Sequence, residues 1–292
     1  MEFYANLHLH STHSDGALTP EELVIAAKEE GYKALAITDH DTATAYPELV
    51  EACKKHDMDC IFGTEFSAFN PIETHVVAFH YDPEYPEMKK YLEDMAWVTE
   101  VTTKGCFDEA VEKGNISGIT WQEVLDYNKG IKWLCNNHVF RAMLAKDLVE
   151  EGEYMAWFLL NFEAQRAKHK PKFDFLKTNE IIDLIHRAGG IAFIAHPDKE
   201  HFDNIETFIE WGIDGIEVEH PDLDRQQRDK CMKIAKKYNF LISGGSDHSG
   251  LCSGLYSGYP DEETLKKSRT YIEPLSSGTS YEYYMQIKNY KK

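Results

Sequence analysis

The sequence predicts an α/β protein in which strands and helices alternate around a parallel sheet or barrel, interrupted by one all-helical segment. Short apolar runs alternate with amphipathic helical patterns over residues 1–85 and again over residues 172–292, and such alternation is typical of parallel sheets and barrels. Residues 86–171 instead show periodic apolar positions on long polar stretches, which indicates consecutive helices. We therefore expect a barrel domain from 1–85 and 172–292, with 86–171 as an inserted helical cap over the substrate.

The first part of the chain contains four expected strands, at residues 3–10, 33–40, 60–69 and 73–82. Helices are expected within residues 19–32 and 45–58. The first helix carries a full start signal, because Thr19 suits the N-cap, Pro20 the first helical position and Glu22 the capping-box position. Gly31 is its expected stop.

After the insertion, alternation resumes with a helix before Gly189 and Gly190 and a buried strand that ends at His196. A helix at 205–212, a strand at 213–221, a helix at 224–239 and a strand and loop at 240–250 complete the domain. The C-terminal tail, rich in Tyr and Lys, carries no readable chemistry.

Composition limits the possible partners. The formal net charge of −19 on 292 residues argues against long nucleic acids, because their binding depends on Lys and Arg neutralising phosphates. A phosphorylated small substrate would need a local positive centre, which bound metal ions can supply. The chain shows no leader peptide or membrane-spanning apolar run, and its six cysteines form no C-x-x-C pair. These features predict a cytoplasmic protein with reduced, mostly buried thiols and no membrane partner.

Candidate ligand residues follow the predicted strands. His8 and His10 alternate along the first strand and so face the same side. The carboxyl ends of strands are where α/β folds assemble their sites. The other candidates at or just beyond strand ends are His40, Glu65, His196, His220 and Asp247.

This set of imidazoles and carboxylates, without clustered thiolates, suits Zn²⁺, Mn²⁺ or Fe²⁺. More than six ligands would overfill one ion. The count therefore predicts two or three divalent transition metals with a carboxylate between them.

Several segments together resemble the PHP (polymerase and histidinol phosphatase) family. They are "NLHLHSTHSDGALTPEELVIAAKEEGYKALAITDHDT", "GTEFSA", "THVVAFHYD", "AGGIAFIAHPD", "GIEVEHP" and "GGSDHSG". The chain is most similar to stand-alone members with a helical insertion, which act as nucleoside 3′,5′-bisphosphate phosphatases. The resemblance implies a distorted (β/α)7 barrel with a trinuclear metal site at the strand ends.

Carried over by motif, the resemblance implies three ligand sets. The first metal would bind His8, His10, Glu65 and Asp247. The second would bind Glu65, His75 and His196, and the third would bind Asp15, His40 and His248.

This chain departs from the family pattern in three places. It has Asn6 where the family often has Asp, and Asp247 and His248 are adjacent where Asp-x-His is common. The insertion stretch "CNNHVFR" keeps His138 and Arg141 but lacks the preceding arginine of related phosphatases. Because these two residues share a helix face, we expect both to bind substrate, with Arg141 as the main phosphate contact and Lys168 or Lys170 as alternatives.

The predicted reaction is metal-dependent hydrolysis of a small, nucleotide-type phosphomonoester, with a hydroxide bridging two ions as nucleophile. Glu65 and Asp247 would be catalytic through the metals, and His220 would be a proton donor or phosphate contact. Alternatives are a histidinol-phosphate-type phosphatase and a cyclic or oligonucleotide phosphodiesterase. Hydrolysis of a C–N bond and a non-catalytic metal-binding module are the alternatives from other classes.

His13, His80, His56, His169, His186 and His201 are expected to lie outside the ligand set. Asp39 and Asp41 flank His40, and one of them is a candidate to orient its imidazole.

Overall fold

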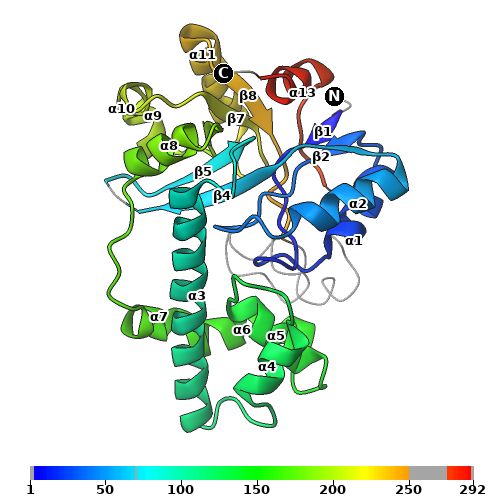
Figure 1. Ribbon diagram of the computed structural model, residues 1–292, viewed down its shortest axis with the longest axis vertical. Helices are drawn as coiled ribbons and strands as arrows, with labels where there is room; N and C mark the ends of the chain where they lie inside the picture. Colours follow the sequence, from blue (N-terminus) through cyan, green and yellow to red (C-terminus); the bar gives the residue numbers. More distant parts are fainter. Residues whose placement is uncertain (1–2, 70, 250–274, 291–292) are drawn as a thin grey trace.

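A computed structural model describes residues 3–69, 71–249 and 275–290 of the chain, and its strands form two sheets (Figure 1). The smaller sheet is parallel, in the order β1 (Ala5–Asn6), β2 (Ala34–Leu35), β3 (Asp59–Cys60). The larger follows chain order: β4 (Gly63–Ala68), β5 (Thr74–Phe79), β6 (Ile191–Ile194), β7 (Gly215–Glu219), β8 (Leu241–Gly244).

The larger sheet is mixed, which corrects the expectation of a parallel one. Strand β5 runs antiparallel to both β4 and β6, whereas β6, β7 and β8 are parallel to one another. The physical reason is the connection after β4, because parallel neighbours need a crossover of a dozen or more residues and only residues 69–73 are available.

Backbone hydrogen bonds join the two sheets at both sides. Leu7 N donates to Gly244 O at 3.1 Å, which links the end of β1 to β8. Glu65 N donates to Thr38 O at 3.0 Å, which links β4 to the segment after β2. The described strands therefore form a continuous hydrogen-bonded frame in a mixed α/β fold.

Helices cover this frame, five of them where the sequence predicts them and two, at Lys199–Asp203 and Tyr281–Lys288, where it predicts none. Thr19 caps α1 through a complete capping box with Glu22, which confirms that start signal. The helices of this part are α1 (Pro20–Glu29), α2 (Tyr46–His56), α8 (Thr178–Arg187), α9 (Lys199–Asp203), α10 (Ile205–Glu210), α11 (Arg225–Tyr238) and α13 (Tyr281–Lys288).

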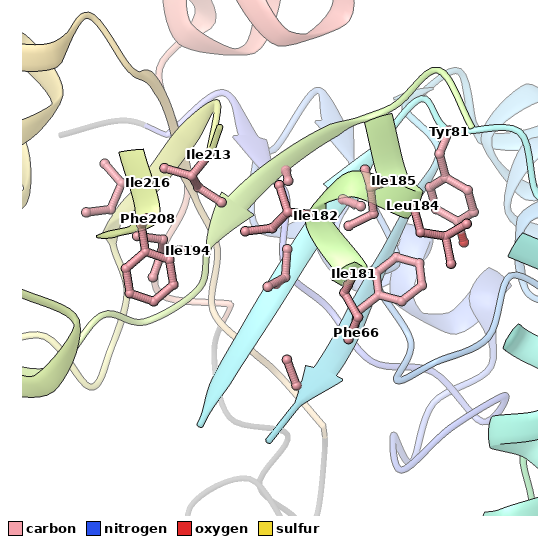
Figure 2. Close-up of a cluster of buried hydrophobic side chains, with 14 of the residues drawn as sticks. Phe66, Tyr81, Ile181, Ile182, Leu184, Ile185, Ile194, Phe208, Ile213 and Ile216 are labelled. Carbon is pink, nitrogen blue, oxygen red and sulfur yellow. The ribbon is translucent and has the colours of Figure 1, made fainter. Parts of the chain in front are cut away.

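The largest core cluster lies between the sheet and these helices (Figure 2). Ile181, Ile182 and Ile185 of α8 pack there with Phe66 and Ile194 of the sheet. Fully burying such side chains stabilises the fold by about 1.5–3 kcal/mol each. This packing fixes the strands whose ends carry the polar side chains.

The segment between β5 and α8 is helical, as predicted. It contains α3 (Pro86–Glu112), α4 (Trp121–Tyr127), α5 (Asn136–Leu144), the 3₁₀ turn η1 (Glu151–Glu153), α6 (Tyr154–Phe158), the π turn η2 (Leu159–Glu163) and α7 (Ala164–His169).

This helical segment has its own core but is tied to the sheets by α3. Residues between 106 and 162 form a separate apolar cluster. Met88, Tyr91 and Met95, on the first turns of α3, belong instead to the main core. In Figure 1, α3 runs from the sheets to the far end of the molecule. One long helix thus holds the helical segment over one end of the sheets.

Of the described cysteines, Cys53, Cys106, Cys135 and Cys231 are buried thiols and Cys60 is partly buried. Cys252 lies outside the described residues. Among the described helices, none has a long enough apolar stretch to cross a membrane.

Candidate metal centre

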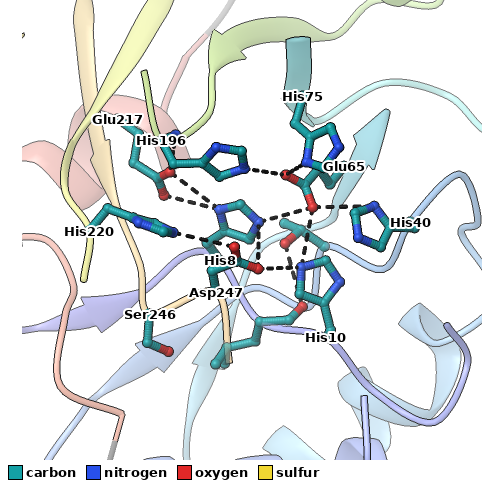
Figure 3. Close-up of polar contacts among 12 residues, drawn as sticks. His8, His10, His40, Glu65, His75, His196, Glu217, His220, Ser246 and Asp247 are labelled. Carbon is teal, nitrogen blue, oxygen red and sulfur yellow. Dashed lines mark hydrogen bonds and ion pairs between the residues drawn. The ribbon is translucent and has the colours of Figure 1, made fainter. Parts of the chain in front are cut away.

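The polar side chains predicted from strand ends meet at one edge of the sheets (Figure 3). His8 and His10 follow β1, His40 follows β2, and Glu65 lies within β4. His75 is near the start of β5, and because β5 is antiparallel its start lies at the same edge as the ends of the parallel strands. His196, His220 and Asp247 follow β6, β7 and β8.

Glu65 lies at the centre of the cluster, and its two oxygens face different imidazoles. Oε1 is 3.0 Å from Nδ1 of His75 and 3.2 Å from Nε2 of His196. Oε2 is 3.2 Å from Nε2 of both His8 and His10, and 3.3 Å from Nδ1 of His40. One carboxylate therefore stands between two sets of nitrogen ligands.

Asp247 and Asp15 complete the side of the cluster around His10. Asp247 Oδ1 is 2.8 Å from His10 Nε2 and 3.5 Å from His8 Nε2. Asp15 Oδ1 is 3.4 Å from His10 Nδ1, and its Oδ2 is 3.8 Å from His40 Nε2. Four compact groups result among the described residues: His8, His10, Glu65 and Asp247; His10, Asp15 and His40; His40, Glu65 and His75; and His8, Glu217 and His220.

These spacings fit metal ligation. Two ligand atoms that each lie about 2.1 Å from one ion are about 3.0–3.4 Å apart in octahedral or tetrahedral coordination. Within the part of the chain that the structure describes, Nε2 of His8, Nε2 of His10 and Oε2 of Glu65 are buried yet make no hydrogen bond of good geometry. The lone pairs of these three atoms are therefore available to bind a metal ion that lies between them.

The charges of the site are strongly coupled. Burial alone would raise the pKa of the Glu65 carboxyl, but the imidazoles around it hold that pKa well below its usual value. Burial likewise opposes protonation of His8 and His10, and the surrounding carboxylates still raise both pKa values. Divalent cations would supply the same compensating positive charge and leave the imidazole lone pairs free to bind.

His196 and Asp247 lie on unusual backbone, with φ angles of 26° and 51°. Such conformations cost about 1–3 kcal/mol each and persist only where the surroundings impose them. Here His196 N donates to Glu217 Oε2 at 2.8 Å, and Asp247 N donates to His8 O at 2.9 Å. The fold therefore uses strained backbone to direct two of the candidate ligands.

Glu217 is a candidate site residue that the sequence reasoning missed. It is buried in β7, and its Oε1 lies 3.1 Å from Nδ1 of His8. A carboxylate that accepts the Nδ1 proton leaves Nε2 as the metal-binding nitrogen, which is the usual support of a ligating histidine. Its signal was a charged residue between Ile216 and Val218 in the middle of the predicted strand "GIEVE".

The third predicted ligand set is only partly brought together. Asp15 and His40 lie together with His10, whereas His248 is in none of the compact groups among the described residues. The His248 side chain is buried on the wall of the adjoining cavity, and its carbonyl accepts a hydrogen bond from His10 N. Metal binding by His248 stays a prediction.

Gly245 explains how the loop before His248 can approach His8. A Cβ at Gly245 would lie 2.3 Å from both the backbone nitrogen and the Cβ of His8. Glycine is therefore needed for close packing, not for a left-handed conformation, since neither Gly244 nor Gly245 has a positive φ. Gly250, the last glycine of the "GGSDHSG" motif, lies outside the described residues.

Asp39 and Asp41 do not orient His40 by any hydrogen bond that the structure shows. Asp39 accepts hydrogen bonds from Ser11 N at 2.7 Å and from Ser14 Oγ at 2.5 Å. Asp41 accepts one from Ser67 N at 3.1 Å, and burial raises its pKa to about 7. Asp39 thus holds the loop that carries Asp15, and Asp41 holds the end of β4.

The histidines expected outside the ligand set have other partners. His13 contacts Thr44 and Glu48, and His80 Nε2 bonds to the carbonyl of Ile287. The remaining four pair with acidic side chains, as His56–Glu21, His169–Glu109, His186–Asp214 and His201–Asp198. None of the six belongs to a compact ligand group of the described chain.

A cavity of about 800 Å³ opens over the cluster. Its walls include the candidate ligands Asp15, His40 and His75, together with His220 and Asp222. The helical segment contributes the other side of the cavity, with Trp133, Cys135, Asn136, Asn137 and Arg166.

Arg141 and His138 are not among the residues that line this cavity, so the prediction that they bind substrate gains no support from its walls. The Arg141 guanidinium donates to the carbonyls of Gly16 and Thr12. His138 is fully buried, with Nδ1 accepting from Cys135 N at 3.0 Å and Nε2 bonding to Thr12 O at 3.1 Å. The two residues do share a helix face, but that face packs on the loop of residues 12–16 instead of the substrate space.

Lys168 and Lys170, the alternative phosphate contacts, lie beside Arg166 on the chain. Lys168 Nζ donates to Glu109 Oε2 at 2.7 Å. Lys170 Nζ lies over the rings of Phe69 and Phe175, 4.7 and 4.1 Å from their centroids. Arg166 lines the 800 Å³ cavity and was missed, because the sequence does not show which turn of α7 faces it.

The buried neutral His138 predicts a pH-dependent stability. Burial, followed by the charge of Arg141, lowers its pKa to about 3. At pH values between about 3 and 6.5, His138 is protonated in the unfolded chain but neutral in the folded protein. The free energy of unfolding therefore falls as the pH falls through this range. His138→Gln keeps a capping-box acceptor without this titration. The stability advantage of the unsubstituted protein over the variant should shrink by roughly 2 kcal/mol between pH 7 and 5 in urea unfolding. Parallel pH curves would show that His138 is not buried in its neutral form.

This chain is similar to known proteins over most of its length. The PHP domain family matches residues 6–242. A 5′-3′ exoribonuclease of Haemophilus influenzae is 31% identical over 262 residues, which cover 87% of this chain and 92% of that protein. A 3′,5′-nucleoside bisphosphate phosphatase of Chromobacterium violaceum is 27% identical over 256 residues, covering 83% and 86%.

A solved structure is also similar to this chain over most of its length. A protein of Bifidobacterium adolescentis, provisionally described as a metal-dependent phosphoesterase, matches with a TM-score of 0.70 and 27% identity over 90% of this chain and 94% of its own. The family match, the cluster of metal-type ligands and the cavity above it agree with one another. The chain therefore belongs to the PHP domain family and is a metal-dependent phosphoesterase.

Proposed function

We propose that the protein hydrolyses a nucleotide-type phosphate ester, with two or more divalent metals held by the cluster around Glu65. The observation that carries the proposal is the position of Glu65, whose two oxygens face separate sets of imidazoles below an 800 Å³ cavity. The frame of strands that places these ligands is then the distorted (β/α)7 barrel implied by the resemblance.

The proposed ligand sets follow the contacts. One ion would bind His8, His10, Glu65 and Asp247, a second would bind Glu65, His75 and His196, and a third would bind between Asp15 and His40. When bound, divalent ions of this kind lower the pKa of water and neutralise the charge of a phosphoryl group.

The protein's own residues orient the candidate ligands and provide a hydrogen-bond donor. Glu217 fixes the ring of His8 through Nδ1, and Asp39 fixes the loop that carries Asp15. His220 Nδ1 accepts the Asp222 N–H at 3.1 Å, so the neutral ring carries its proton on Nε2, which lies 3.5 Å from Asp247 Oδ2. We assign the Nε2–H of His220 as a hydrogen-bond donor to the leaving oxygen, which stabilises the negative charge that develops there.

The leading substrate is a nucleoside 3′,5′-bisphosphate. The cluster can hold the phosphate being cleaved, and Arg166 on the opposite wall offers a guanidinium to the second one. Like the relative from Chromobacterium violaceum, the protein would remove one of the two phosphates.

A short 5′-phosphorylated RNA is the second candidate. Its first nucleoside carries the same two phosphates, with the 3′-phosphate joined to the next nucleotide. The relative from Haemophilus influenzae is described as a 5′-3′ exoribonuclease. The net charge of −19 still favours a short chain over a long one.

A panel of phosphate esters tests this function. Chelator-treated protein receives Mn²⁺, Zn²⁺ or Fe²⁺ and is assayed on adenosine 3′,5′-bisphosphate, a 5′-phosphorylated trinucleotide, a cyclic nucleotide and histidinol phosphate. We expect metal-dependent turnover, highest on one of the first two. Activity confined to the last two would replace the proposed substrate class, and metal binding without turnover would favour a non-catalytic module.

Arg166→Ala should lower kcat/KM for adenosine 3′,5′-bisphosphate much more than for the monophosphate that keeps only the cleaved group. The expected difference is about 1.5–3 kcal/mol, the usual contribution of a hydrogen bond to a charged group. Lys168→Ala is the matched control, because Lys168 is on the same helix but pairs with Glu109. Equal losses on both substrates would assign Arg166 a structural role.

A further inference from the structure

A second cavity, of about 360 Å³, lies between α3, α7 and the end of β4. It shares Ser67, Phe69, Trp133, Asn136 and Arg166 with the cavity over the metal centre. The two spaces therefore meet along these residues, and one ligand can occupy both. We call the smaller space the side cavity.

The walls of the side cavity combine apolar and aromatic side chains with polar ones, which include Asp41, Glu163 and three threonines of α3. The α3 wall includes Met95, Val98 and Cys106, and η2 adds Phe162. Phe69 lies where the two cavities meet and is 44% exposed, although it is a large apolar side chain. A flat ring at such a junction is suited to stacking against another ring.

Trp133 provides a polar group at the same junction. Its side chain is buried, with 7% exposure, and its ring lies 5.9 Å from that of His40 at an interplanar angle of 30°. Its Nε1–H is buried and has no acceptor within the described chain. A buried donor without a partner is costly, so a ligand with a hydrogen-bond acceptor would satisfy it.

Positive charge lies on the α7 side of the same space. Arg166 lines both cavities, and Lys170 lines the side cavity with its ammonium over Phe69 and Phe175. The expected ligand is thus anionic at one end and flat, aromatic and acceptor-bearing at the other. A nucleotide has this combination, whereas a sugar phosphate or an alkyl phosphate lacks the flat aromatic ring.

Resting on the proposed function, we propose that the side cavity is the nucleobase site. The base stacks near Phe69 and meets Trp133 Nε1–H while its phosphate reaches the metal centre.

The test compares two substrates and three forms of the protein. Adenosine 3′,5′-bisphosphate is paired with 1,2-dideoxyribose 3,5-bisphosphate, which keeps a sugar and both phosphates but has no base. Ala167→Trp fills the side cavity from an exposed position on α7. Ala164→Trp is the matched control, because Ala164 is also exposed on α7 but lines neither cavity.

We expect the intact protein and Ala164→Trp to prefer the nucleotide by about 10- to 100-fold in kcat/KM, the usual contribution of one stacked base. Ala167→Trp should reduce this preference to about one while leaving the abasic substrate unaffected. Equal use of both substrates by the intact protein, or equal losses on both in Ala167→Trp, would overturn the base site.

Equilibrium dialysis with both compounds separates this inference from the proposed function. Base-dependent binding that Ala167→Trp abolishes, without any hydrolysis, would support the site and contradict the proposed reaction. Hydrolysis without base-dependent binding would support the proposed reaction and contradict the base site.

Discussion

Glu65→Gln should lower kcat/KM on any phosphate ester substrate by about a thousandfold or more. A bridging carboxylate contributes a negative charge to two ions at once, and an amide supplies one neutral oxygen. Losing one ion removes several kcal/mol of charge stabilisation, and about 4 kcal/mol corresponds to a thousandfold in rate. The position of Glu65 between His75 and His196 on one side and His8 and His10 on the other makes it the residue with the largest expected effect.

The measurement is metal content by elemental analysis together with steady-state kinetics. Glu73→Gln is the control, because Glu73 lines the same cavity, is exposed, and belongs to none of the compact ligand groups of the described chain. Near-normal activity and full metal content in Glu65→Gln would place the bridge on another residue.

His220→Asn should lower kcat by about 10²- to 10³-fold on substrates whose leaving group is a sugar hydroxyl, because the hydrogen bond to the leaving oxygen is lost. The loss should be much smaller on p-nitrophenyl phosphate, because nitrophenolate is a stable anion that leaves without a proton. The structural basis is the Asp222 N–H, which occupies His220 Nδ1 and leaves the proton on Nε2.

Metal content again decides between two roles. His220 also lies close enough to His8 and Glu217 to share an ion with them. Equal losses on both substrates with a lower metal content would show that His220 is a ligand. A selective loss with unchanged metal content is the result that the hydrogen-bond-donor role predicts.

Most of the candidate site could be predicted from the sequence because its residues lie at the ends of strands. His8, His10 and Asp247 could be placed because strands that begin far apart in the chain end at one edge of a sheet. Glu217 was missed because its partner, the Nδ1 of His8, becomes evident only when β7 lies beside the first strand segment. Local spacing carries no information on such contacts between distant segments.

The helical segment shows where sequence reasoning stops. The spacing of His138 and Arg141 correctly placed them on one face of α5, but not against which surface that face would pack. It packs on the backbone of residues 12–16, and Arg166 of α7 takes the place beside the cavity. The antiparallel direction of β5 could have been predicted from the short connection that precedes it.

Anomalous diffraction from crystals of the Mn²⁺-loaded protein tests the central claim most directly. The claim predicts at least two peaks, two of them about 3.5–4 Å apart, one bonded to Oε1 of Glu65 and the other to its Oε2. A single peak, or peaks that do not contact Glu65, would contradict a bridged metal centre at the end of these strands.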